Sequence, residues 1–74
     1  MYIVAKNKNK NGCIAYMSED RTEIANTVRL LNGEGHKGLE VMGISRPEAY
    51  GEYAPYIFVN SIEEFIDRAR ELMR

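Results

Sequence analysis

Four short apolar runs place the strongest constraint on the fold of this 74-residue chain. They cover residues 2–5, 13–17, 39–44 and 56–59, and Glu40 is the only charged residue among them. Runs of four to six apolar residues are typical of strands, and a strand with one wet face would alternate polar and apolar residues. The sequence therefore predicts four strands that are apolar on both faces.

The first two runs are predicted to form a β-hairpin. Asn11-Gly12 lies between them, and this dipeptide tolerates the positive φ angles of a tight hairpin turn. The first arm continues through Lys6, Lys8 and Lys10, and an arm that stays extended would place these three lysines on one face, because side chains alternate with a period of two.

Two helices are predicted from helical start signals and apolar stripes. Asp20 can accept a hydrogen bond from a free N–H at the start of a helix over residues 21–32, and Gly33 supplies its end. Ser61 and Glu64 form a capping-box pattern before the second helix. The apolar stripe of this second helix consists of Ile62, Phe65, Ile66, Ala69, Leu72 and Met73.

The resulting order is ββαββα, which predicts a single small α+β domain over residues 1–74. With right-handed crossovers, the second and third strands run parallel to each other, so the third strand can pair with the first only in the antiparallel sense. We therefore predict a four-stranded antiparallel sheet of order 2-1-3-4 with both helices on one face. A sheet split into two pairs of strands is the alternative.

Residues 45–59 stand out as a candidate binding loop, because they hold both prolines and three of the five tyrosines. Tyr50, Tyr53 and Tyr56 recur every three residues, a spacing that aligns the rings along one edge of a polyproline-like path. Tyrosines offer large contact area, and Arg46 adds a neighbouring anion-binding group. The alternative is that the tyrosine rings fold back and cap the sheet.

Lys6, Lys8 and Lys10 suggest a second possible function, nucleic-acid binding through contacts with phosphates, to which Lys37 could contribute. Against it, the net charge of −1 provides no global field, and no aromatic residue lies between the lysines to stack on bases. Lysines on a hairpin also keep a sheet edge soluble. Solubility is the better interpretation, and nucleic acid is kept as the alternative partner.

No arrangement of residues points to catalysis, a metal or a cofactor. Cys13 and His36 are single residues without ligand spacing around them. The pattern of glycines in residues 33–38 matches G-x-G-x-x-G, but it follows a helix and precedes a strand, which is the reverse of a phosphate-binding turn. Glu63 and Glu64 are adjacent and diverge around a helix. We therefore expect a protein that is not an enzyme and has no cofactor.

The setting and assembly follow from the same patterns. A lone Cys13 cannot form an internal disulfide, which favours the cytoplasm, and no apolar stretch approaches the ~20 residues of a membrane span. Two helices can cover one apolar face of the sheet, and residues 46–55 are too few to shield all of the other. The sequence therefore predicts a homodimer with a protein-interaction or regulatory role.

Overall fold

The computed structural model describes residues 1–46 and 55–72. Its elements follow the predicted ββαββα order: β1 (Tyr2–Asn7), β2 (Cys13–Met17), α1 (Arg21–Gly33), β3 (Leu39–Ile44), β4 (Tyr56–Phe58) and α2 (Ile62–Glu71). Neither helix in the described ranges is long and apolar enough to cross a membrane.

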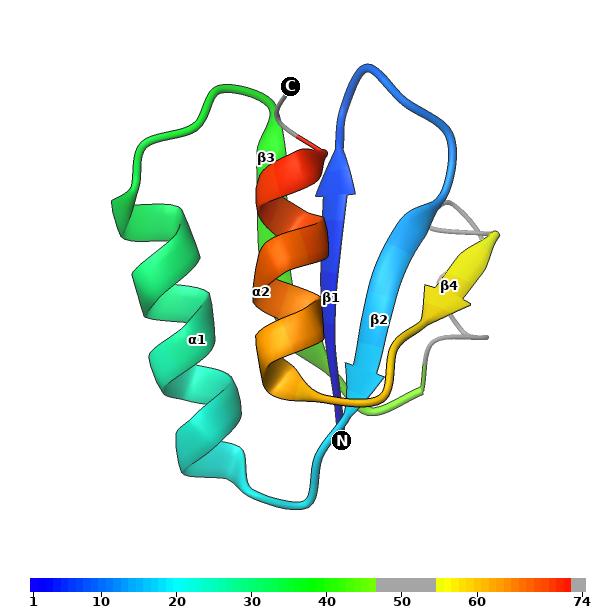
Figure 1. The fold of residues 1–74 in the computed structure, drawn as a ribbon. Helices are drawn as coiled ribbons and strands as arrows, with labels where there is room; N and C mark the ends of the chain where they lie inside the picture. The colour runs from blue at the N-terminus through cyan, green and yellow to red at the C-terminus, as the bar shows by residue number, and fades with distance from the viewer. Residues whose placement is uncertain (47–54, 73–74) are drawn as a thin grey trace.

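All four strands form one mixed sheet of order β3-β1-β2-β4 (Figure 1), so the split sheet is ruled out. β1 pairs antiparallel with β2 and with β3, as predicted. The prediction was wrong for β4, which pairs parallel with β2 instead of antiparallel with β3. Because β1 is antiparallel to both β2 and β3, β4 runs in the same direction as β3 as well as β2, and it lies at the outer side of β2.

Both helices lie on the same face of the sheet, as predicted (Figure 1). Ile3, Ile14 and Val41 point toward them from the strands, and Leu31 and Phe65 are buried completely on the helix side. Burying a large apolar side chain contributes about 1.5–3 kcal/mol, so this layer accounts for most of the core. The sheet is thereby left with one covered face and one face opposite the helices.

Side chains at the helix ends confirm the predicted start positions. Asp20 accepts hydrogen bonds from the N–H groups of Thr22 and Glu23 at 3.0 and 3.1 Å, and Ser61 accepts from the N–H of Glu64 at 3.1 Å. Helix α1 extends one residue beyond the expected end. The positive φ angle of 72° that follows it belongs to Gly35.

The turn between β1 and β2 is longer than the predicted two-residue turn. Asn7 accepts from the N–H of Asn9 at 2.9 Å with its side chain and from the N–H of Lys10 at 3.0 Å with its carbonyl. The Asn7 amide also donates to the carbonyl of Leu72 at 2.7 Å, which ties the end of β1 to the end of α2. The chain therefore leaves the strand at Asn7 and does not continue extended to residue 10.

Candidate functional site

The candidate site lies on the sheet face opposite the helices. Strand register assigns alternate side chains to this face, and four of them are buried: Val4, Cys13, Ala15 and Ile44. Among the described residues, the partly buried Tyr2, Met42 and Tyr56 pack against this group. A second apolar layer therefore lies on the face opposite α1 and α2, as expected from strands that lack polar alternation.

Three aromatic side chains form a row across this face at its β4 end. The rings of Tyr56 and Phe58 are stacked with centroids 6.0 Å apart, and Phe58 meets Tyr2 edge to face at 6.1 Å. Met17 is the cross-strand partner of Tyr2 and extends the row along β2. We call these four residues, Tyr2, Met17, Tyr56 and Phe58, the aromatic patch.

The aromatic patch is exposed where it reaches the end of the sheet. Phe58 is 58% exposed and Met17 is 50% exposed, although both are large apolar residues. Ile57, on the helix side of β4 because it pairs with the buried Ile14, is 53% exposed. The rim of the sheet at β4 therefore presents apolar side chains on both of its faces, a pattern associated with interaction surfaces.

The predicted tyrosine loop overlaps this site only in part. Tyr56 belongs to the aromatic patch, where it packs against the buried apolar layer as well as against Phe58. Arg46 is exposed just after β3. Tyr50 and Tyr53 lie outside the described residues, so the predicted alignment of the three tyrosine rings stays a prediction.

Sequence reasoning did not identify Tyr2, Met17 and Phe58 as site residues. Their signal was the absence of polar alternation in the strands, which gave the apolar character of the second face but not the positions where it is exposed. Exposure at Phe58 depends on β4 being the last strand of the sheet. That position could not be assigned from the sequence while β4 was expected beside β3.

The three lysines do not lie along one face of an extended strand, because the strand ends at Asn7. Lys6 belongs to β1 and is opposite Glu40 of β3, whereas Lys8 and Lys10 lie in the turn. Lys8 forms an ion pair with Glu40 at 3.6 Å. The regular basic face that motivated the nucleic-acid alternative is thus absent from this part of the structure.

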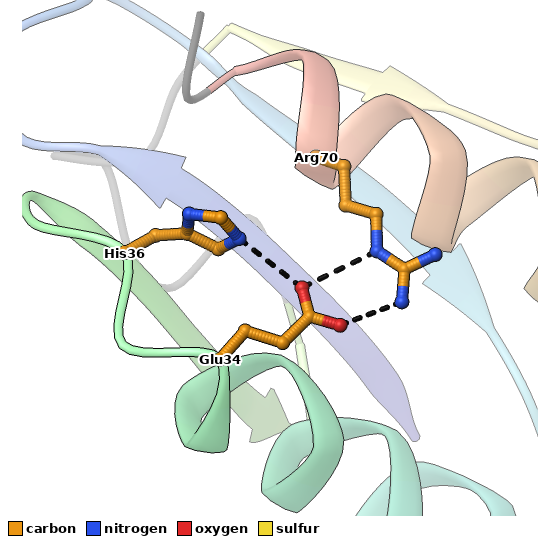
Figure 2. Close-up of polar contacts among 3 residues, drawn as sticks. All are labelled: Glu34, His36 and Arg70. Carbon is orange, nitrogen blue, oxygen red and sulfur yellow. Dashed lines mark hydrogen bonds and ion pairs between the residues drawn. The ribbon is translucent and has the colours of Figure 1, made fainter.

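A polar cluster on the helix side joins Glu34, His36 and Arg70 (Figure 2). Arg70 donates to both carboxylate oxygens of Glu34, at 3.2 and 2.6 Å, and His36 Nε2 lies 3.2 Å from Glu34 Oε1. The hydrogen bond from Arg70 lowers the pKa of Glu34, and the pKa of Arg70 is raised in turn. Both oxygens of Glu34 are thus engaged, and the cluster links the end of α1 to α2.

Cys13 belongs to the buried apolar layer against which the aromatic patch packs, and it is 2% exposed. Burial raises its thiol pKa to about 11, and the nearby positive charge of Lys6 only partly opposes this effect. A protonated, buried thiol is a poor nucleophile and a poor metal ligand. Over residues 1–46 and 55–72, no three His, Cys, Asp or Glu side chains gather in a group able to hold a metal ion.

Comparison with known proteins identifies a family. Residues 1–72 match the family described as "Family of unknown function (DUF6718)", and the chain therefore belongs to this family. No curated protein matches the chain.

Proposed function

We propose that this member of a family of unknown function is a small cytoplasmic protein-interaction module without enzymatic activity, and that the aromatic patch is its contact surface. The observation that carries the proposal is the exposure of Phe58, a large apolar side chain on the last strand that is 58% exposed beside Tyr2 and Tyr56. Complete burial of a large apolar side chain contributes about 1.5–3 kcal/mol, and a partner that covers the exposed 58% of Phe58 gains roughly half of this.

The composition of the patch supports binding to protein. Aromatic residues and methionine are enriched at the centres of protein interfaces, and tyrosine combines apolar area with a hydroxyl group for hydrogen bonding. The rings of Tyr2 and Phe58 are held by their mutual contact, so this part of the surface is preorganised, while the unbranched side chain of Met17 can adapt to a partner. A preorganised surface loses less conformational entropy on binding.

The chemistry of the other polar groups supports a role without catalysis. Cys13 is buried with a raised pKa, and both carboxylate oxygens of Glu34 are engaged, one by Arg70 and the other by Arg70 and His36. A catalytic site requires a nucleophile or base that is placed beside a cleft and free to react. A lone thiol without a disulfide partner suits the reducing cytoplasm.

Site-specific photo-cross-linking in cells tests this proposal. A benzophenone amino acid replaces Met17 in one variant and Arg29, which is exposed on α1, in the control. We expect discrete cross-linked protein species from position 17 and none from position 29. Loss of the position-17 adducts on Phe58→Ser would tie them to the patch.

The cross-linking pattern can also contradict the proposal. If position 17 gives no adduct, or if both positions give the same pattern, the aromatic patch is not a specific contact surface and the proposed function is wrong.

A further inference from the structure

We infer that the partner is a second copy of this chain, and that two β4 strands pair antiparallel across a two-fold axis at Phe58 to form a continuous eight-stranded sheet. This inference rests on the proposed function, because it names the partner of the same surface. It differs from a face-to-face contact in using the backbone of β4 as well as the side chains of the patch.

The two outer strands of the sheet differ in how they are protected. α1 runs beside β3 (Figure 1), and the Asn32 side-chain amide donates to the carbonyl of Val41 in that strand at 3.3 Å. By contrast, β2 is the only strand of the described chain that pairs with β4, so no described strand lies on the outer side of β4. The outer strands of a sheet are the usual place for a further strand to add.

The backbone of Phe58 is oriented for such pairing. Cys13 N–H donates to the carbonyl of Pro55, and Val59 N–H donates to the carbonyl of Ala15, both at 2.9 Å. Residues 55 and 59 thus direct their backbone groups toward β2, and these directions alternate along a strand. The N–H and C=O of Phe58 consequently point away from β2. Two copies of Phe58 can exchange a pair of N–H···O=C bonds, as in the hydrogen-bonded pairs of an antiparallel sheet.

The side chains on β4 favour a second copy over a charged partner strand. Ile57 is exposed on the helix side and Phe58 on the opposite side, so a pairing strand must be apolar on both faces. β4 itself meets this requirement. Residues 55–61 contain no charged residue, and the net charge of −1 adds little repulsion between copies. In the pair, the two Phe58 rings would lie side by side and join the two aromatic patches.

Sedimentation equilibrium of the purified full-length protein tests the inference. We expect the mass of the wild-type protein to rise with concentration from 8.5 kDa toward twice that value. Ile57→Lys places a charge on β4 outside the patch face and should hold the protein at the monomer mass. Leu30→Lys, at an exposed apolar position on α1, is the matched control and should associate like the wild type.

Two substitutions at Phe58 separate backbone pairing from side-chain contact. Phe58→Ala removes the ring but keeps the outward N–H. Phe58→Pro removes the ring and the outward N–H, and it leaves the hydrogen bonds between β4 and β2 intact because the N–H of residue 58 does not point toward β2. Strand pairing predicts that proline abolishes association and that alanine shifts it to at least tenfold higher concentration. Circular dichroism checks that each variant remains folded. If Phe58→Pro does not fold, the result with Ile57→Lys decides whether β4 forms the interface.

Two results would overturn the inference. A dimer that Ile57→Lys leaves intact would place the interface elsewhere. A monomer at every concentration would exclude self-association, and cross-links from position 17 to a different protein would then leave the proposed function standing. If those cross-links are also absent, the proposed function fails as well.

Discussion

Asn7 joins the end of β1 to the turn that follows it and to the end of α2. It is 8% exposed, its side chain bonds Leu72 and Asn9, and its carbonyl accepts from Lys10. Asn7→Ala leaves the Leu72 carbonyl and the Asn9 N–H without these partners, so we expect the free energy of unfolding to fall by about 1–3 kcal/mol. Urea denaturation measures the loss. The exposed Asn11→Ala is the control, and equal stability of the two variants would contradict this role for Asn7.

Glu34 should make stability depend on pH. Its pKa is lower in the folded protein than in the unfolded chain, because Arg70 hydrogen-bonds its charged form. Its contribution is thus fully present above the ordinary pKa of glutamate and is lost as the pH falls through the lower folded-state pKa.

Glu34→Gln tests this dependence. We expect the variant to have a lower Tm than the wild type at neutral pH, and we expect the two Tm values to converge in acid. Glu71→Gln, at an exposed position of α2, is the control. A Tm difference between Glu34→Gln and the wild type that stays the same at every pH would show that the charge of Glu34 is not the cause.

Cys13 reports on the integrity of the second apolar layer. With its pKa raised to about 11, the thiol should react with iodoacetamide at pH 8 about 100-fold more slowly in the folded protein than in urea. Mass spectrometry of timed samples gives both rates. Similar rates would mean that the sheet face over Cys13 is open to solvent.

The side-chain contacts that hold the fold together could be predicted from the sequence only in part. The caps at Asp20 and Ser61 were predictable because they act on backbone groups two or three residues away. The bond from Asn7 to Leu72 and the pairing of Glu34 with Arg70 join residues that are far apart in the chain. Local patterns carry no information about such contacts until the topology is known.

At the scale of elements, the sequence identified all four strands and both helices but misplaced β4. The apolar runs and helical stripes are local properties, and β2 and β3 begin and end where they were predicted. A strand has the same side-chain period whether its neighbour is parallel or antiparallel. The choice between β3 and β2 as the neighbour of β4 therefore depended on the path of residues 45–55, which the pattern did not determine.

Gly12 links the hairpin turn to this placement of β4. Its φ angle is 85°, and a Cβ at this position would lie 3.0 Å from the carbonyl oxygen of Pro55. Gly12→Ala combines left-handed strain with this close contact, so we expect a loss of about 1–3 kcal/mol in the free energy of unfolding.

Gly33→Ala is the matched control for Gly12. Its position in α1 has no positive φ angle and open space around the added Cβ, so the helix should be unchanged or more stable. Thermal unfolding compares the two variants. If Gly12→Ala were as stable as Gly33→Ala, neither the positive φ angle nor the close approach of Pro55 would require a glycine at position 12.

At the scale of the whole molecule, the two faces of the sheet are covered differently. α1 and α2 cover one face and provide most of the core, and the aromatic patch occupies the end of the other face beside β4. The expectation of a second apolar face came directly from the strand sequences. Its assignment as a site needed the exposure of Phe58, which lies on the last strand, and of Met17, which lies beyond the part of β2 that β4 pairs with.

Amide hydrogen exchange at Phe58, followed by NMR at two protein concentrations, tests the central claim that two copies of the chain pair through β4. The Phe58 N–H points away from β2, so it should exchange rapidly in a dilute sample and become protected in a concentrated one. The N–H of Val59, which already donates to Ala15, serves as the internal reference and should change little. Exchange of Phe58 at the same rate in both samples would contradict pairing through β4.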